Sequence, residues 1–246
     1  MPMLCTRQIS CKTCPHRARN LFSRLSNSEL EVVDRGKTVH KYDRGAIVCH
    51  EGTPSLAAYC IYSGWIQFYT IGVQGRSQGI RLEGPGQLAA YLGMLCDKPC
   101  VTSGKVVERA TVCIIPRPTL MTLLESSAGF KQAMLRRTAA DLVSSVQQTT
   151  SVAQETVRQR LARVIAEACH FPSRARAPQA DLNVSLMRTE LAEMAGTTPE
   201  SCSRVLSKMA DDRILALTRT GLMVQNLEAL MRIADLEQSA PGPSLA

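Results

Sequence analysis

The sequence contains no run that approaches eighteen consecutive apolar residues, so no transmembrane helix is expected. The first residues, MPMLCTRQISCKTCPH, lack the apolar core of a secretory signal peptide and carry cysteines and basic residues instead. These two absences predict a cytoplasmic protein with no membrane partner. In that reducing compartment, the 10 cysteines of the 246-residue chain are not expected to form structural disulfides.

The excess of positive charge lies in only one part of the chain. Residues 1–150 contain 18 Lys and Arg against 10 Asp and Glu, whereas residues 151–246 contain 11 of each kind. The net charge of +8 therefore says nothing about nucleic acid binding by the second part. Any such function there has to be argued from motif geometry.

The region from about Arg35 to Pro116 is predicted to form short strands. The runs AAYCIY and WIQFY are rich in β-branched and aromatic residues, and Ser63-Gly64 between them is expected to form a turn. Glycine-rich corners punctuate the rest of the region, and no repeat or low-complexity stretch interrupts it. Many short strands with glycine corners indicate a small double-sheet β barrel or jelly roll.

A long helix is predicted to follow the strands. The segment from Thr119 to His170 contains no proline, and its only glycine is Gly129. Apolar residues recur at helical spacing from Phe130 onward, at Met134, Leu142, Val146, Ala153, Val157 and Leu161. Beyond this helix, SRARAPQA is expected to be a linker, and the terminal SAPGPSLA a disordered tail.

Two further helices are predicted in a helix–turn–helix arrangement. A short helix over Thr189 to Ala195 is expected to end at Gly196, which suits the left-handed C′ position. Thr198 then caps a second helix, whose first position is Pro199. The buried face of this second helix is predicted to consist of Cys202, Val205, Leu206 and Met209.

A different face of the second helix carries Glu200, Ser203 and Arg204. Arginine can bond to the O6 and N7 atoms of guanine, glutamate can accept from cytosine N4, and serine can bond to either. The alternative is an exposed helix with three solvated polar residues. Two short strands around Arg219-Thr220-Gly221 add a predicted wing, and this order of elements favours a recognition helix in the DNA major groove.

From about Phe22 to Asp235 the chain resembles the bacterial CRP–FNR family of transcription regulators. The resemblance is carried by KYDRGAIVCHEGTPSLAAYCIYSGWIQFY and by the E-x-x-S-R pattern of Glu200, Ser203 and Arg204. It implies an α+β fold with an N-terminal double-stranded β-roll, a long dimerisation helix and a C-terminal winged helix–turn–helix. It also implies a homodimer that binds an inverted repeat of TTGAT type and works with RNA polymerase. Thr198 and Arg219 join the expected DNA-binding residues.

The resemblance also suggests where the domains begin and end. Residues 1–21 form a cysteine-containing arm, residues 22–122 a sensor roll, and residues 123–160 the dimerisation helix. Residues 161–236 form the DNA-binding domain, and residues 237–246 are the tail.

Cyclic AMP is not expected to be the effector of this roll. The cyclic-nucleotide branch of the family uses a glutamate and an Arg-Ser/Thr pair to hold ribose and phosphate. In GPGQLAAYLGMLCDKPCVTSGK the glutamate is replaced by Gln87, and the pair is replaced around Pro99, Cys100 and Val101. A phosphate without an arginine partner is poorly bound.

The resemblance instead implies an iron–sulfur cluster, expected to be of the [4Fe–4S] type. The oxygen-sensing branch holds its cluster with three leading cysteines and one cysteine before an Ile-Pro step. The corresponding residues here are Cys5, Cys11 and Cys14, with Cys113 in TVCIIP. The leading cysteines are spaced C-x5-C-x2-C, whereas the branch uses C-x2-C-x5-C, and Asn20 stands six residues after Cys14.

Several alternatives for these thiols stay open. The cysteines could bind zinc or act as a thiol redox switch, or the roll could sense nitric oxide through heme. Cys96 or Cys100 could replace a ligand, and His16 is a more distant candidate. No ligand role is expected for Cys49, Cys60, Cys169 and Cys202. No enzyme is predicted, because a catalytic C-x-x-C pair such as Cys11 and Cys14 would be expected to open a helix of an α/β fold.

Overall fold

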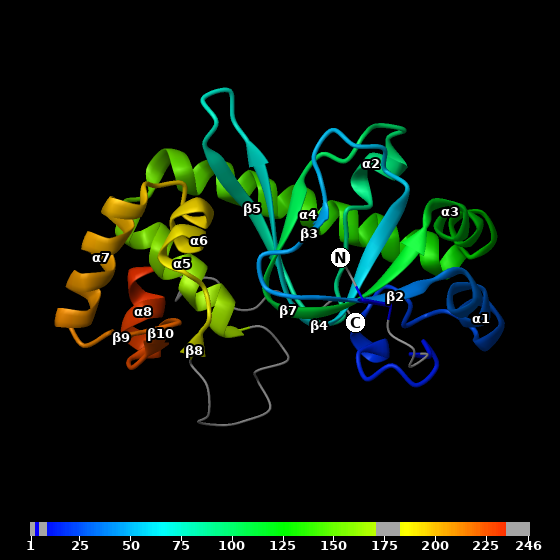
Figure 1. The fold of residues 1–246 in the computed structure, drawn as a ribbon, viewed down its shortest axis with the longest axis horizontal. Coiled ribbons are helices and arrows are strands. Elements are labelled where there is room, and N and C mark those ends of the chain that lie inside the picture. The colour runs from blue at the N-terminus through cyan, green and yellow to red at the C-terminus, as the bar shows by residue number, and fades with distance from the viewer. Residues whose placement is uncertain (1–2, 5–8, 171–182, 235–246) are drawn as a thin grey trace. The chain divides into compact units, whose positions relative to one another are not determined.

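The computed structural model describes residues 3–4, 9–170 and 183–234 of the chain (Figure 1). These residues fall into two compact units. The first unit combines the residues up to Thr70 with Arg81–Ser144, and the second combines Ile71–Ile80 with the residues from Ser145 onward. Among the described residues, no helix is long and apolar enough to cross a membrane.

The N-terminal part is a roll of antiparallel strands. The sheet order is β1-β2-β7-β4-β5, with β3 also paired to β7 and β6 to β4. The strands are β1 (Met3–Leu4), β2 (Thr38–Tyr42), β3 (Ile47–Cys49), β4 (Ala57–Ile71), β5 (Ser77–Glu83), β6 (Leu88–Ala89) and β7 (Ser103–Pro116). The predicted roll is therefore confirmed, and the long strand β7 lies between β2 and β4 at its centre.

The turn predicted at Ser63-Gly64 is wrong. Strand β4 runs without a break from Ala57 to Ile71, and only its pairing register with β7 shifts between Ile61 and Ile66. Gly64 has a φ of +80°, and a Cβ atom there would lie 2.2 Å from the carbonyl oxygen of Arg109. Glycine thus permits a bulge in close contact with β7, so the strand bends and continues where the sequence suggested a turn.

Three helices pack against the strands of the roll around one of its apolar cores. They are α1 (Asn27–Gly36), the short α2 (Leu92–Leu95) and α3 (Arg117–Ser126), preceded by the 3-10 turn η1 (Arg17–Arg19). Ser26 starts α1 with a capping box, because its side chain accepts from Glu29 while the Glu29 carboxylate accepts from the Ser26 backbone. These helices share one apolar core with the strands, and the ring of Phe22 and the first turns of the long helix that follows α3 also join it. The core contains Leu30, Val33, Cys60, Leu88, Tyr91, Cys113, Ile115, Leu120, Leu123, Phe130 and Met134.

The long helix is shorter at its C-terminal end than predicted. Helix α4 spans Ala128–Gln154, and α5 (Val157–His170) is a separate helix. The break comes from a second capping box, in which Thr156 and Gln159 each accept a hydrogen bond from the other residue's backbone N–H. The expected dimerisation helix over residues 123–160 therefore consists of the end of α3, all of α4 and the start of α5.

The C-terminal part has the predicted winged helix–turn–helix. Helices α6 (Arg188–Met194) and α7 (Pro199–Asp211) are followed by strands β9 (Leu215–Thr218) and β10 (Gly221–Val224) and by α8 (Leu227–Ile233). A short strand β8 (Asn183–Val184) pairs with β10 and widens the wing to three strands. Gly196 has a φ of +59°, as expected for the residue that ends the first helix of the motif.

Candidate cofactor pocket and DNA-binding helix

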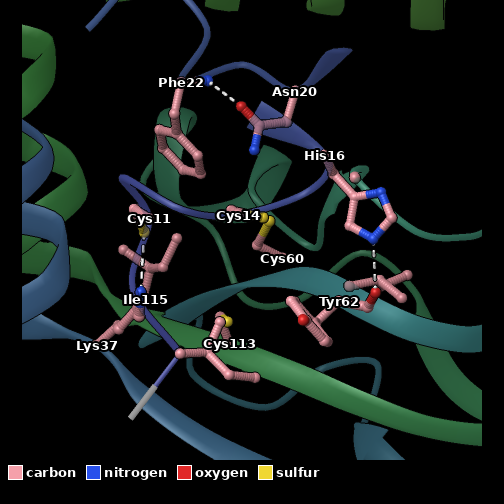
Figure 2. Close-up of a pocket in the computed structure, with 13 residues that line it drawn as sticks. Cys11, Cys14, His16, Asn20, Phe22, Lys37, Cys60, Tyr62, Cys113 and Ile115 are labelled. Carbon is pink, nitrogen blue, oxygen red and sulfur yellow. Dashed lines mark hydrogen bonds between the residues drawn. The ribbon is translucent and has the colours of Figure 1, made fainter. Parts of the chain in front are cut away.

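Four cysteines line one pocket on the N-terminal side of the roll (Figure 2). Cys11 and Cys14 come from the segment before η1, whereas Cys60 lies on β4 and Cys113 on β7. The two strand cysteines are direct partners in the antiparallel register. Phe22, Ile61 and Ile115 form apolar parts of the pocket wall, so the cysteine sulfurs lie in a largely apolar environment.

Helix α1 holds the N-terminal segment against this pocket. The backbone N–H of Cys11 donates to Asp34 Oδ1 over 2.8 Å, and the Ser10 hydroxyl donates to Asp34 Oδ2 over 2.9 Å. Lys37, directly after α1, places its Nζ 2.8 Å from the Cys11 sulfur and also pairs with Asp34. The Lys37 side chain is only 3% exposed, so its charge faces the thiols and not the solvent.

Burial keeps three of these thiols protonated in the absence of a bound group. Desolvation raises the pKa of Cys11 to about 12, although Lys37 works against that shift. It likewise raises the pKa of Cys113 to about 11, again opposed by Lys37. Burial raises the pKa of the Cys60 thiol, and ionisation of Cys113, Cys14 or Cys11 would raise it further. The thiols are thus close enough to affect one another's ionisation.

His16 and Asn20 also line the pocket, and the side chain of each has a backbone partner. The Nε2 atom of His16 lies 2.9 Å from the carbonyl oxygen of Tyr62. Asn20 is buried, and its Oδ1 accepts from the backbone N–H of Phe22 over 2.9 Å. Both contacts are drawn in Figure 2. The hydrogen bond occupies one ring nitrogen of His16, so the candidate donors for a bound metal group are the four thiols and the other His16 nitrogen.

The pocket contains three of the four predicted metal ligands. Cys11, Cys14 and Cys113 come together, whereas Cys5 lies outside the described residues. The proposed substitutes Cys96 and Cys100 are not among the pocket residues, since Cys96 is exposed and Cys100 packs in a second core with Cys49. Sequence reasoning missed Cys60 and Lys37. Only the pairing of β4 with β7 could have indicated Cys60, and a single sequence does not show that pairing.

The donor set fits an iron–sulfur cluster in its chemistry. Such clusters are bound by cysteine thiolates, usually four, and four thiols line this pocket beside one buried cation. In the part of the chain that the structure describes, no group of three His, Cys, Asp or Glu side chains is placed to hold a single metal ion. The pocket thus has the sulfur donors for a cluster but is not a ready-made single-ion site.

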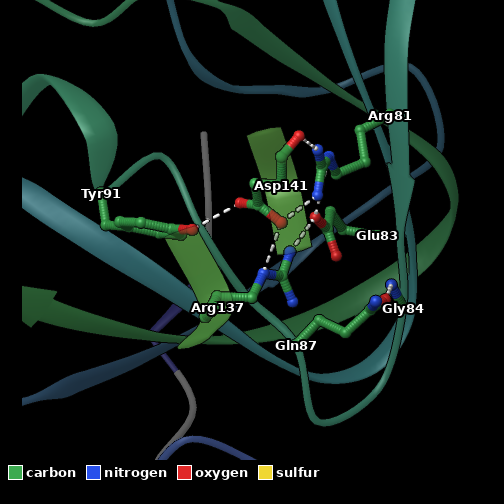
Figure 3. A network of polar contacts seen from close by, with 7 residues as sticks. All are labelled: Arg81, Glu83, Gly84, Gln87, Tyr91, Arg137 and Asp141. Atoms are coloured by element: carbon green, nitrogen blue, oxygen red, sulfur yellow. Dashed lines mark hydrogen bonds and ion pairs between the residues drawn. The ribbon is translucent and has the colours of Figure 1, made fainter. Parts of the chain in front are cut away.

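A second polar feature of the first unit is a buried network of charges that joins β5 to α4 (Figure 3). Arg137 donates to Glu83 over 2.5 Å and to Asp141 over 2.9 Å, and Arg81 pairs with Asp141. The Tyr91 hydroxyl also donates to Asp141. The Glu83 side chain is only 2% exposed. The network connects the roll directly to the long helix.

Gln87 occupies the position of the glutamate in the cyclic-nucleotide branch, and its side chain forms a hydrogen bond to the backbone in this structure. Its Oε1 accepts from the N–H of Gly84 over 2.5 Å (Figure 3). The side-chain oxygen of Gln87 therefore forms a hydrogen bond within the turn between β5 and β6.

Helix α7 presents the predicted DNA-binding side chains at its N-terminal end. The Thr198 hydroxyl caps the helix by accepting from Ser201, and Pro199 occupies the first turn. Glu200 and Arg204 are exposed, and Ser203 is half-buried. The opposite face is buried through Cys202, Leu206 and Met209, whereas Val205 is only half-buried. Arg219 lies exposed in the wing turn between β9 and β10.

Helix α4 carries an exposed apolar stripe with heptad spacing. Leu135, Leu142 and Val146 are 71%, 66% and 59% exposed. Ala139, Thr149 and Ala153 continue the alternation of three and four residues, and all three are exposed. Met134, one of the apolar positions that predicted the long helix, lies outside this stripe and is buried in the core of the roll. The stripe has the periodicity of a two-stranded coiled coil.

Comparison with protein families matches both parts of the chain. Residues 39–127 match the cyclic nucleotide-binding domain, and residues 159–233 match the Crp-like helix-turn-helix domain. The chain belongs to the CRP–FNR family of transcription regulators. As a CRP–FNR regulator it is a DNA-binding protein and not an enzyme.

Curated relatives extend this similarity over most of the chain. The fumarate and nitrate reduction regulatory protein of Escherichia coli K12 is 24% identical over 231 residues, which cover 92% of this chain and 90% of that protein. The protein of the same name from Yersinia pestis matches at the same identity and coverage.

Solved structures of CRP–FNR proteins have the same fold. FixK2 from Bradyrhizobium japonicum aligns with a TM-score of 0.69 at 18% identity, covering 80% of this chain and 96% of that one. The c-di-GMP-responsive regulator CLP of Xanthomonas campestris aligns with a TM-score of 0.68, also at 18% identity, covering 81% and 99%. The predicted α+β architecture is confirmed.

Proposed function

We propose that this chain is a cytoplasmic CRP–FNR regulator of the oxygen-sensing type, which senses oxygen or redox state through a [4Fe–4S] cluster. The observation that carries the proposal is the meeting of N-terminal and strand cysteines in one pocket of the roll. Cys11, Cys14 and Cys113 would supply thiolates, with Cys5 as the fourth ligand expected from the resemblance. When bound, the cluster would supply the iron and sulfide that react with oxygen or change redox state.

The residues around the pocket favour an anionic group. Thiolate ligands and cluster together carry negative charge, and the buried Lys37 ammonium lies beside the Cys11 sulfur to offset it. Asp34 holds both Lys37 and the backbone of Cys11, so it fixes the segment that provides two ligands. Phe22 and Ile115 add apolar surface to the pocket beside the sulfur atoms.

A direct contact joins the pocket to the long helix. Phe22 lines the pocket, and its ring stacks on that of Phe130 in the first turn of α4. A change in the N-terminal segment on cluster loss would therefore alter the packing at the start of α4. We propose that this changes the pairing of α4 with the α4 of a second copy along the exposed stripe. Polar Thr149 interrupts that stripe, which favours the marginal association that a switch needs.

In the active state, α7 would read the major groove of a TTGAT-type inverted repeat as part of a homodimer. The exposed Arg204 would bond to guanine, with Glu200 and Ser203 at neighbouring bases. Thr198 and Arg219 would contact the DNA backbone, and bound dimers would act on RNA polymerase. The two-fold symmetry of the dimer would match that of the repeat.

We further propose that no cyclic nucleotide acts as effector. Two arginines near Gln87, Arg81 on β5 and Arg137 on α4, are already paired with Glu83 and Asp141. A phosphate would have to displace these carboxylates, and the separation of a buried ion pair is costly. Gln87 is committed to Gly84 in the same region.

A second candidate is a thiol switch without iron. Directly paired residues on antiparallel strands have Cβ atoms about 4.5–5.5 Å apart, which is near the range that a disulfide needs. Cys60 and Cys113 are such a pair. An oxidant such as a peroxide would then join the two sulfur atoms and be reduced by two electrons as both thiol protons leave.

Iron and sulfide analysis of protein purified without air tests the proposal. We expect both elements in the wild type, and their loss in Cys11→Ser, Cys14→Ser and Cys113→Ser proteins. Cys202→Ser, a buried cysteine of the other unit, is the control and should retain both. Wild-type protein without iron that forms a Cys60–Cys113 disulfide on oxidation would favour the thiol switch instead. Heme absorbance, with iron but no sulfide, would reject both.

A further inference from the structure

Cys60 is set apart from the other buried strand cysteine by its surroundings. Cys60 and Cys49 are almost equally exposed, at 8% and 7%, and both belong to the same sheet. Cys49 packs in the second core beside Tyr42 and Cys100, away from the pocket residues. Cys60 instead lines the pocket that contains Cys11, Cys14 and Cys113. The two cysteines are therefore equally buried but differ in their surroundings, and Cys60 is the one that lines the pocket.

The pairing of β4 with β7 places two sulfur atoms on one face of the sheet. Cys60 and Cys113 are register partners, and the side chains of such partners lie on the same side. Figure 2 shows both sulfurs directed toward the segment of Cys11 and Cys14. Two donors thus come from rigid strands and two from the N-terminal segment.

We propose that Cys60 is a cluster ligand and that Cys11, Cys14, Cys60 and Cys113 form the complete set. The proposal rests on the cluster named above and replaces Cys5 in its ligand set. The pocket supplies four thiols, the number a [4Fe–4S] cluster binds, and cysteine thiolates are the usual ligands of such clusters. The cluster would then join the N-terminal segment to two neighbouring strands.

Three serine variants of the full chain, each purified without air, test this assignment. Iron and sulfide per chain and the visible absorption of the cluster are measured for Cys60→Ser, Cys5→Ser and Cys49→Ser. We expect Cys60→Ser to lose most of the iron and sulfide, as we also expect for Cys113→Ser. Cys49→Ser matches it in burial and sheet and should retain the wild-type content, as should Cys5→Ser.

The outcomes separate this assignment from the proposed function. Full iron and sulfide in Cys60→Ser, or their loss in Cys5→Ser, would overturn the role of Cys60 and leave the cluster in place. Wild-type protein with neither element would overturn the cluster itself, and this assignment with it. Circular dichroism shows whether Cys60→Ser folds. If it does not, Cys5→Ser decides, because that change leaves every described pocket residue intact.

Discussion

The rings of Phe22 and Phe130 are stacked, with 5.7 Å between their centroids and 6° between their planes. Phe22 lines the cysteine pocket, and Phe130 is fully buried in the first turn of α4. The proposed sensor and the proposed dimerisation helix therefore share one aromatic contact. A signal in the pocket can reach α4 through this pair without passing through the rest of the roll.

Phe22→Leu should weaken that coupling while leaving the cysteines in place. We expect the variant to bind iron and sulfide as the wild type does. The difference in dimerisation between anaerobic and air-exposed protein should become smaller, because a leucine cannot stack on Phe130. Sedimentation of both forms measures the difference. Leu25→Val, which alters the same core but leaves the rings of Phe22 and Phe130 in place, is the control and should keep the wild-type difference. An unchanged wild-type dimer in both forms would reject dimerisation as the switch.

Arg204→Ala should reduce specific DNA binding by about 1–3 kcal/mol and relax the preference for the half-site guanine, because the bidentate contact is lost. Gel-shift titrations against a TTGAT palindrome and its single-base variants measure both effects. Lys208→Ala removes another exposed charge from α7 and should weaken binding to all sequences alike. Wild-type base discrimination in the Arg204 variant would show that the assignment is wrong.

Arg137→Met should destabilise the first unit by about 3–5 kcal/mol, because it leaves Arg81 as the one cation for the Glu83 and Asp141 carboxylates of the network. Urea unfolding at neutral pH gives the free energy of unfolding. The double variant Arg137→Met/Glu83→Gln should recover part of the loss, since it removes the more buried of the two carboxylates and leaves Arg81 to pair with Asp141. Arg35→Met is the matched control, because Arg35 pairs with Glu31 at the surface and is 80% exposed. Little change is expected there.

Glu155, in the break between α4 and α5, should make the stability of the second unit depend on pH. Its partial burial opposes ionisation, but hydrogen bonds from Arg163 and Ser151 outweigh that effect and lower its pKa. A lowered carboxyl pKa stabilises the fold above the ordinary glutamate value of about 4.3, and this contribution disappears as the pH falls through the folded-state value. Glu155→Gln should therefore cost about 1–3 kcal/mol at pH 7.

The cost of Glu155→Gln should shrink as the pH is lowered below about 4. Urea unfolding of wild type and variant at a series of pH values gives this difference. Glu228→Gln removes the same charge from an exposed pair with Arg232 and should have little effect at any pH. A constant difference between wild type and Glu155→Gln would mean that the interaction with Arg163 does not depend on the ionised carboxylate.

Local sequence signals were sufficient for the helix–turn–helix. Gly196, Thr198 and Pro199 mark the end of one helix and the start of the next through backbone chemistry that acts within a few residues. The periodicity of Cys202, Leu206 and Met209 fixed the buried face, and so placed Arg204 on the exposed one. The Thr156 capping box that ends the long helix was also present in the sequence, but the apolar periodicity continues across it.

The cysteine pocket depended on tertiary structure. The sequence by itself showed a cluster of N-terminal thiols, and the family resemblance added Cys113. That Cys60 joins them follows from the register of β4 against β7, which pairs residues 60 and 113. Strand register is set by long-range packing and by the bulge at Gly64, and neither is visible in a local pattern. Nothing in the local sequence distinguishes Lys37 from an ordinary surface lysine. Its charge is buried beside Cys11 because the N-terminal segment packs on α1.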